Sequence, residues 1–224
     1  MENTTTPHKK LALVHCPLNL EAQPIPGAGT LPPLALLALA THLEKRFPLL
    51  EIEVFDGEHL SVEYIQEQIK EKNFDVVGIS VIASEAYRGA LEIAKKAKEQ
   101  GAVVVLGGEH AIIRNKQILS HRPYIDFVVA GQGESALEGI IRKDPSQSIP
   151  QLTYREGSVI ITNSQKRLPL HLIPVPSRKY IDLANYSKRF QKTLESKLTG
   201  LKCFTTIRTQ DGCLKAIREG VCTF

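Results

Sequence analysis

Tryptophan is absent from the 224-residue chain, and Phe, Tyr and Trp together supply only 6% of its residues. A hydrophobic core must therefore be built from Leu, Ile, Val and Ala, a composition that favours a parallel β-sheet covered by helices. Hydrophobic residues make up 42% of the chain and charged residues 23%. This is the balance of a globular protein, and it argues against intrinsic disorder.

Long hydrophobic runs and abundant cysteine are also missing. No apolar stretch reaches the ~18 residues that a membrane-spanning helix needs. The Thr-rich start, Met1–Lys10, does not have the pattern of a secretory signal. With 4 Cys and no secretory features, a disulfide framework is not expected, and the predicted location is a reducing cytoplasm.

The sequence lacks the motifs of several common nucleotide-binding and signalling folds. No Gly-Lys-Ser/Thr string is present, which excludes a P-loop. Gly27–Gly29 comes well after the first predicted strand and has no third glycine, which argues against a dinucleotide fingerprint. A phospho-receiver needs an acidic pair after the first strand and an Asp after the third, where this chain has His15-Cys16 and Ser80.

The two parts of the chain differ in charge. Acidic residues outnumber basic ones over residues 1–150, and basic residues outnumber acidic ones over 151–224, so the net charge of +4 combines an acidic body with a basic tail. The tail has no regular aromatic interleaving and no known nucleic-acid-binding pattern. We therefore expect a solvated or partner-facing surface, with neither nucleic acid nor a membrane as partner.

Strand-like and helix-like patterns alternate along residues 1–150. Short apolar runs predict strands, and longer amphipathic stretches with capping residues predict helices. This alternation, with short loops and right-handed crossovers, predicts an α/β fold with a doubly wound, five-stranded parallel sheet. The predicted strands cover 10–14, 51–55, 74–80, 102–106 and 125–130. The predicted helices cover 34–47, 61–72, 85–100, 111–120 and a last one that opens at 131–134 and runs to about 143.

After Pro150 the pattern changes. Two short runs, 151–155 and 159–162, flank a turn at Gly157 and predict a β-hairpin. A Pro-rich linker and a tail with one or two weak helices follow, and no separate core is evident in them. We therefore expect an α/β domain over 1–150, a hairpin with linker over 151–183, and the start of a further region over 184–224.

Ligands of open parallel sheets bind at the carboxyl ends of the strands. A pair of glycines there lets backbone approach a bulky ligand, although a tight turn explains the pair equally well. A serine at a strand end can bond a ligand or cap a turn, and an acid at the start of a helix can simply be favoured by the helix dipole. The candidate site residues are Ser80, Val81, Ile82, Gly107, Gly108, Glu109, His110, Gly131, Gln132, Gly133 and Glu134.

Several strings occur in the order and at the spacing of a known family. DVVGIS, VVVLGGEH, DFVVAGQGE and the hairpin QLTYREGSVI follow an opening helix PPLALLALA. Over about residues 10–183 the chain resembles the cobalamin-binding N-terminal half of B12-dependent radical SAM proteins. The resemblance implies a corrin ring over the Gly-rich turns and a buried nucleotide tail bonded by Ser80. It also implies that backbone at Gly107, Gly108, Gly131 and Gly133 lies against the ligand, with the long loop 17–33 beside the ring.

The chain departs from the Asp-x-His-x-x-Gly motif of B12-binding proteins that donate a histidine to cobalt. Asp56 is followed by Gly57-Glu58-His59, so the histidine is one place late and the closing glycine is missing. The resemblance to the radical SAM branch, which commonly lacks that histidine, implies a base-off corrinoid without a protein imidazole from His59 or elsewhere on its lower face.

The C-terminal segment resembles the start of a radical SAM cluster loop. Three closely spaced Cys hold such a [4Fe–4S] cluster, whereas Cys213 and Cys222 form an incomplete metal motif, and unrelated free thiols are an alternative. We expect no competent cluster in this chain, which reads as a fragment or truncated product, and a loosely packed segment over 185–224. The cluster and S-adenosylmethionine would belong to a full-length parent.

The function expected from these features is that of a cobalamin-binding module of a methyltransferase-like radical SAM enzyme, not catalytically complete alone. Its partners would be a corrinoid and a radical SAM catalytic domain or separate chain. The alternative is a doubly wound domain without cofactor that serves as an interaction or regulatory module. The charge difference between the acidic body and the basic tail would then mark its partner surface. An enzyme using another nucleotide is disfavoured because no phosphate loop is present.

Overall fold

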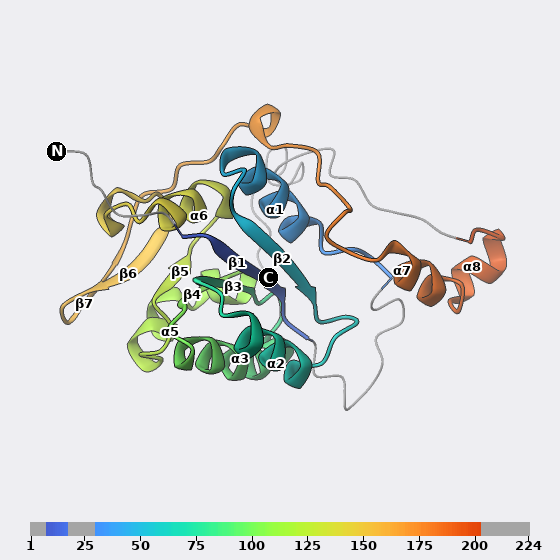
Figure 1. Cartoon of the computed structure of the whole chain (residues 1–224), viewed down its shortest axis with the longest axis horizontal. Helices are drawn as coiled ribbons and strands as arrows, with labels where there is room; N and C mark the ends of the chain where they lie inside the picture. The colour runs from blue at the N-terminus through green and yellow to red at the C-terminus, as the bar shows by residue number, and fades with distance from the viewer. Residues whose placement is uncertain (1–7, 18–29, 203–224) are drawn as a thin grey trace, which may run out of the picture.

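A seven-stranded sheet forms the centre of the protein in the computed structural model, which describes residues 8–17 and 30–202 (Figure 1). The strand order is β2-β1-β3-β4-β5-β6-β7. The first five strands are parallel, and β6 and β7 run antiparallel to their neighbours. The strands are β1 (Lys10–His15), β2 (Glu51–Asp56), β3 (Val76–Ser80), β4 (Val103–Gly107), β5 (Phe127–Val129), β6 (Leu152–Glu156) and β7 (Val159–Thr162).

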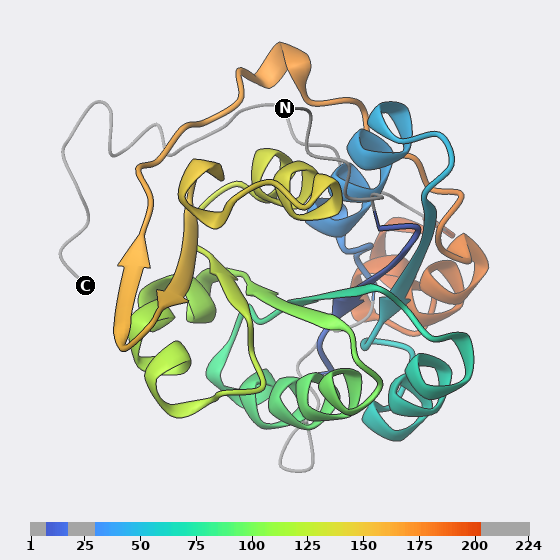
Figure 2. The same cartoon turned by 60° about the vertical axis from the view of Figure 1, so that its left-hand side comes forward.

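Helices cover both faces of this sheet. Helices α1 and α6 lie on one face, and α2, α3 and α5 lie on the other (Figures 1 and 2). Within the described part of the chain, no helix is long and apolar enough to cross a membrane. The helices are α1 (Leu34–Arg46), α2 (Val62–Lys72), α3 (Tyr87–Glu99), α4 (Glu109–Ile113), α5 (Asn115–His121), α6 (Gly133–Arg142), α7 (Leu183–Phe190) and α8 (Leu194–Thr199), with 3-10 turns at Ser84–Ala86, Ser146–Ser148 and Leu170–Leu172.

Strand β1 shows how the sequence builds two cores. Successive side chains of a strand point to opposite faces of the sheet, and β1 is apolar on both. Leu11 and Leu13 are buried in the core beneath α1 and α6. Ala12 and Val14 are buried in the core beneath α2, α3 and α5. A strand buried on both faces needs this continuous apolar run, which is why the central strands could be recognised from sequence.

The predicted five-stranded parallel sheet is confirmed, and the predicted hairpin extends it. Strand β6 pairs with β5, so the hairpin is continuous with the sheet and does not stand apart from it. The single helix predicted over 111–120 is wrong, because the chain forms two short helices, α4 and α5. They are separated at Arg114, whose φ of −108° is not helical, and the Asn115 side-chain amide donates to the Ile112 carbonyl at 2.7 Å.

The chain after β7 crosses the molecule and docks on it. Residues 163–182 run past α6 to α1 (Figure 2), where the Ser177 amide donates to the Thr41 hydroxyl at 2.8 Å. Helix α7 lies beside the carboxyl end of β2, with Tyr186 and Phe190 buried. The loose packing expected from residue 185 onward therefore does not hold for α7. Residues 203–224, including Cys213 and Cys222, lie outside the described residues.

Candidate functional site

Four residues form a continuous row across the carboxyl ends of the strands. The final positions of β1 and β2 are register partners, as are those of β1 with β3 and of β3 with β4. The row reads Asp56, His15, Ser80, Gly107. The chain passes from β1 to β2 on one side of β1, and then from β2 to β3 on its other side. The row therefore crosses the point at which ligands bind in open α/β sheets.

The larger of two adjoining cavities, which we call the slot, lies between the sheet and helices α1 and α6. It has a volume of about 570 Å³. Leu13 and Val105 form its floor, Leu39 of α1 and Leu137 of α6 form its walls, and Ser80 lies at its end. This volume is within the range of small-molecule and cofactor sites. The lining combines apolar side chains with polar ones, among them Glu134, Gln165 and Arg167.

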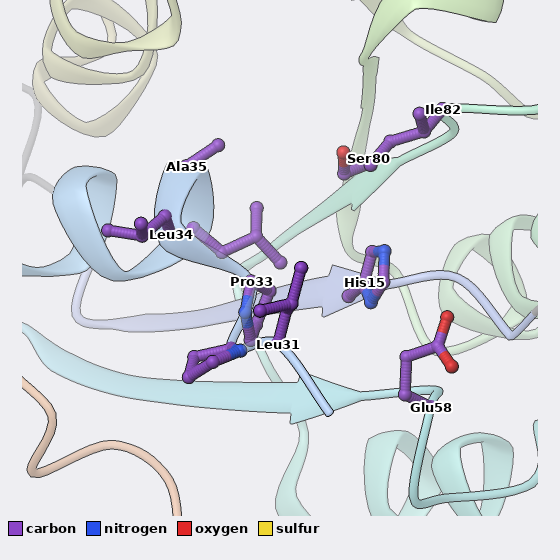
Figure 3. Close-up of a pocket in the computed structure, with 10 residues that line it drawn as sticks. His15, Leu31, Pro33, Leu34, Ala35, Glu58, Ser80 and Ile82 are labelled. Carbon is purple, nitrogen blue, oxygen red and sulfur yellow. The ribbon is translucent and has the colours of Figure 1, made fainter. Parts of the chain in front are cut away.

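A second cavity, the mouth cavity, adjoins the slot above the ends of β1 and β3 (Figure 3). It has a volume of about 320 Å³ and shares Ala35, Leu36 and Ser80 with the slot. Its remaining lining includes His15, Glu58 and Pro33, and Ile82 stands at its edge. The two cavities therefore adjoin through these shared residues, and His15, Glu58 and Ser80 place polar groups over the strand ends.

The structure brings eight of the eleven predicted site residues into the lining of the slot. Ile82 lines the mouth cavity, with 56% of its surface exposed. Val81 lines neither cavity, because its side chain is fully buried and its backbone joins the ends of β3 and β4: its amide donates to the Gly107 carbonyl at 2.8 Å. The eight residues in the slot are Ser80, Gly107, Gly108, Glu109, Gly131, Gln132, Gly133 and Glu134.

His110 also lines neither cavity. Its ring packs against Tyr87 with centroids 4.7 Å apart, and its Nδ1 lies 3.3 Å from the Ser84 hydroxyl. Burial, with a further contribution from Arg114, lowers the pKa of His110. The Nε2 atom is buried without a hydrogen-bond partner among the described residues. These contacts make His110 part of the packing between the β3–α3 turn and α4.

The glycines at the strand ends have different structural environments, and a side chain would be tolerated differently at each. Gly108 has a φ of +89°, and a β-carbon there would lie 2.6 Å from the Val81 carbonyl oxygen, so a tight backbone turn accounts for it. A β-carbon on Gly131 would lie 1.7 Å from Oε1 of Gln151. A β-carbon on Gly107 would meet nothing within 4 Å. Gly107 is thus the position of these three at which the missing side chain leaves open space for a ligand.

Ser80 and Glu134 each place a polar side chain in the lining of the slot. The Ser80 hydroxyl has no hydrogen-bond partner among the described residues, although it lines both cavities. Glu134 lies in the first turn of α6 and is 6% exposed. The α6 dipole favours an acid at that position irrespective of any ligand. Ser80 therefore remains the clearest free hydrogen-bonding group in the site.

Asp56 is the centre of a hydrogen-bond network at the edge of the mouth cavity. Its side chain is buried and accepts from His15 Nδ1 at 2.8 Å, from the Glu58 amide at 3.1 Å and from the Tyr186 hydroxyl. Burial alone would raise the pKa of Asp56, but the bonds from His15, Tyr186 and Glu58 outweigh it and hold the pKa below its ordinary value of 3.8. Asp56 is therefore a carboxylate at neutral pH.

His59 packs behind this network rather than in the site. Its ring meets that of Tyr186 edge to face, with centroids 4.4 Å apart, and its Nε2 is buried without a partner among the described residues. Burial lowers the pKa of His59, so the ring is neutral at neutral pH. It lines neither the slot nor the mouth cavity.

Comparison with protein families identifies the fold. The model of the B12 binding domain matches residues 26–141, which is more than half of the chain. The chain belongs to the B12-binding domain family. The matched segment contains α1 through α6, and with them the helix walls of the slot and most of the strand ends around it.

Relatives of this B12-binding domain include enzymes much longer than the chain. It is 28% identical over 187 residues to the uncharacterized methyltransferase PH0819 of Pyrococcus horikoshii, covering 79% of this chain and 40% of that protein. It is 25% identical over 162 residues to the cobalamin-dependent radical SAM methyltransferase TokK of Streptomyces tokunonensis, covering 67% and 23%. The expected resemblance to cobalamin-dependent radical SAM proteins is thereby confirmed.

A solved structure shows the same fold. The cobalamin-dependent S-adenosylmethionine radical enzyme OxsB, with aqua-cobalamin and S-adenosylmethionine bound, superposes with a TM-score of 0.68 at 18% identity. The match covers 81% of this chain and 25% of OxsB. The chain thus spans well under half the length of these proteins.

Sequence reasoning placed His15 and Asp56 at strand ends but assigned them no role. The signal that could have linked them was that each directly follows a predicted strand, 10–14 for His15 and 51–55 for Asp56. These two strands are neighbours in the sheet. Tyr186 gave no such signal, because it lies 130 residues after Asp56. Cys213 and Cys222 lie outside the described residues, within which no group of three metal-ligating side chains occurs.

Proposed function

We propose that this B12-binding domain binds a corrinoid with its nucleotide tail in the slot and its macrocycle over the mouth cavity. A corrinoid is a flat ring carrying an elongated tail, so it requires a narrow recess beside an open platform. The slot and the mouth cavity, joined through Ala35, Leu36 and Ser80, supply that combination. This shape, found in a member of the B12-binding family, is the observation that carries the proposal.

The residues present suit the proposed ligand. The open space at Gly107 admits a bulky group against backbone, and the apolar floor and walls suit an aromatic base. We assign to Ser80 a hydrogen bond to the tail, since its hydroxyl is free at the end of the slot. Gly107, Gly108, Glu109, Gly131, Gln132, Gly133 and Glu134 would line the tail, Ile82 would border the ring, and Val81 and His110 would act only by supporting the β3 and β4 turns.

Binding in this orientation would be base-off. The base of the nucleotide tail cannot lie between α1, α6 and the sheet and also bind the metal at the centre of the ring. With the tail held in the slot, the residues in the row of strand ends would be the ones that face the ring.

We further propose that the domain works as the corrinoid-carrying part of a methyltransferase-like radical SAM enzyme. A bound corrinoid supplies a cobalt centre able to carry a methyl group. The residues of the slot and mouth would hold and orient it, while a [4Fe–4S] cluster and S-adenosylmethionine would be held by a catalytic domain outside the described residues or by another chain. The relatives PH0819 and TokK favour this assignment, and the cysteine content favours the cytoplasm.

The test is corrinoid retention. Purified protein is mixed with hydroxocobalamin and desalted, and the absorbance of the protein fraction is recorded. We expect stoichiometric corrinoid with the wild type and at least a ~10-fold weaker affinity for Gly107→Leu, which fills the slot. Val159→Leu, which introduces a leucine at a 58% exposed position of β7, far from the slot lining, is the control and should bind normally.

Two results would contradict the proposal. Absence of corrinoid from the wild-type fraction would favour the cofactor-free interaction domain instead. Retention that is equal in the wild type and Gly107→Leu would show that the tail does not enter the slot.

A further inference from the structure

His15 differs from every other histidine in the described residues because it alone lines the slot or the mouth cavity. It is the last residue of β1, at the centre of the row of strand ends, and its side chain is 15% exposed (Figure 3). Its Nδ1 is occupied by the bond to Asp56. Its Nε2 has no hydrogen-bond partner among the described residues.

This is the arrangement by which proteins prepare an imidazole to bind a metal. A metal-binding histidine generally donates its other ring N–H to a carboxylate, which fixes the tautomer and ring orientation and makes the free nitrogen more basic. A proton on Nδ1 of His15, donated to Asp56, leaves a lone pair on Nε2. The His15 ring is therefore held in the form that can donate to a metal.

The carboxylate that orients His15 is itself held from two sides. The Glu58 amide donates to the same oxygen, Oδ1, that accepts from His15, and the Tyr186 hydroxyl donates to Oδ2. Tyr186 is 3% exposed and comes from α7, far from β1 and β2 in sequence. The C-terminal segment thus contributes to the orientation of a group in the mouth cavity.

We infer that His15, through Nε2, is the protein donor to the cobalt of the bound corrinoid, with Asp56 and Tyr186 as positioning residues. The inference rests on the proposed corrinoid site and extends it. A base-off corrinoid seated over the strand ends presents its lower face to that row, in which His15 is the residue able to donate a nitrogen. The sequence-based expectation of no imidazole considered the displaced His59, whose Nε2 is buried behind Tyr186.

Electron paramagnetic resonance of the bound, one-electron-reduced cob(II)alamin tests this directly, because an axial nitrogen splits the cobalt lines. Protein labelled with ¹⁵N-histidine is loaded with unlabelled cobalamin, reduced anaerobically and compared with unlabelled protein. A protein imidazole gives threefold splitting with ¹⁴N and twofold splitting with ¹⁵N. We expect that change in the wild type, its loss in His15→Ala, and its retention in His59→Ala.

Tyr186→Phe examines the positioning role. It keeps the ring packed on His59 and removes only the hydroxyl, so we expect retained corrinoid with a weakened or heterogeneous nitrogen splitting. Because His15→Ala could disturb the fold, the labelling comparison in the wild type decides the ligand without any substitution.

The outcomes separate the inference from the proposed function on which it rests. If the corrinoid binds and the splitting stays threefold in the ¹⁵N-histidine-labelled protein, the nitrogen comes from the corrinoid's own base. That result overturns the inference. Bound corrinoid with no nitrogen splitting, or with a histidine splitting that persists in His15→Ala, overturns it as well while leaving corrinoid binding intact. Failure of the wild type to retain any corrinoid overturns the proposed function itself.

Discussion

Gln151 places its side-chain amide where residue 131 would carry a β-carbon. Its Oε1 lies 1.7 Å from that position and accepts from the Gln132 amide at 2.8 Å, while its Nε2 donates to the Lys166 carbonyl at 2.8 Å. Gln151 is 1% exposed and has a φ of +61°. This one side chain thus joins the turn between β5 and α6 to the segment that follows β7.

Gly131→Ala should therefore destabilise the fold. The new methyl group displaces the Gln151 amide and leaves buried hydrogen-bonding groups without partners, at a cost of about 2 kcal/mol. Urea unfolding followed by circular dichroism measures the change in the free energy of unfolding. Gly107→Ala is the matched control, because its β-carbon meets nothing within 4 Å, and it should unfold within ~0.5 kcal/mol of the wild type. Equal stability of the two variants would refute the role given to Gln151.

Local patterns were sufficient to predict the parallel sheet but not the contacts that complete the site. Strands β1, β3, β4 and β5 are apolar and largely buried, and this pattern is visible in each run by itself. The pairing of β6 with β5 depends on residues distant in sequence, as does the insertion of Gln151 against Gly131. A string of glycines can be recognised in the sequence. Which glycine cannot be replaced depends on the distant residue that fills the space of its β-carbon, as Gln151 does at Gly131.

The same limit applies to the row of strand ends. Ser80 and Gly107 could be predicted to lie at one edge of the sheet, because carboxyl ends of parallel strands meet there. The bond of Tyr186 to Asp56 could not, since it joins β2 to a helix beyond the Pro-rich linker and no periodicity encodes it.

Helix α7 should detach when Tyr186 loses its ring. Tyr186→Ala removes the buried contact with His59 and the bond to Asp56, and truncation of a buried aromatic side chain costs about 3 kcal/mol or more. We expect trypsin to cleave after Lys188 and Arg189 much faster in this variant than in the wild type, as measured by mass spectrometry over a time course. Leu194→Ala, at a 70% exposed position of α8, should leave the rate unchanged. Cleavage at the wild-type rate in Tyr186→Ala would mean that α7 is not held by this contact.

Acid should weaken the packing of α1 against α6. Glu138 of α6 lies 2.6 Å from His42 Nε2 and 3.1 Å from Arg142, and Arg46 is also near. Burial alone would raise the pKa of Glu138, but the bonds from His42 and Arg142 outweigh it, so the pKa is lowered from its ordinary value of 4.5. The stability that this carboxylate contributes is present above pH 4.5 and is lost as the pH falls through the lower folded-state pKa.

Urea unfolding across the acid range measures this dependence. We expect the free energy of unfolding of the wild type to fall below pH 4.5 more steeply than that of Glu138→Gln, which cannot titrate. Glu195→Gln, at an exposed position of α8, should follow the wild type. Parallel profiles for the wild type and Glu138→Gln would show that another group governs the acid transition.

The slot should discriminate corrinoids by their tails. Cobinamide has the corrin ring but lacks the nucleotide base, so it would occupy the mouth cavity and leave the apolar slot unfilled. Because burial of apolar surface contributes roughly 25 cal/mol per Å², we expect cobinamide to bind at least ~10-fold more weakly than cobalamin, as measured by equilibrium dialysis. Gly107→Leu should weaken cobalamin binding and leave cobinamide binding nearly unchanged, since the added side chain enters the slot and not the platform. A substitution that weakens both corrinoids equally would place the ring, rather than the tail, over Gly107.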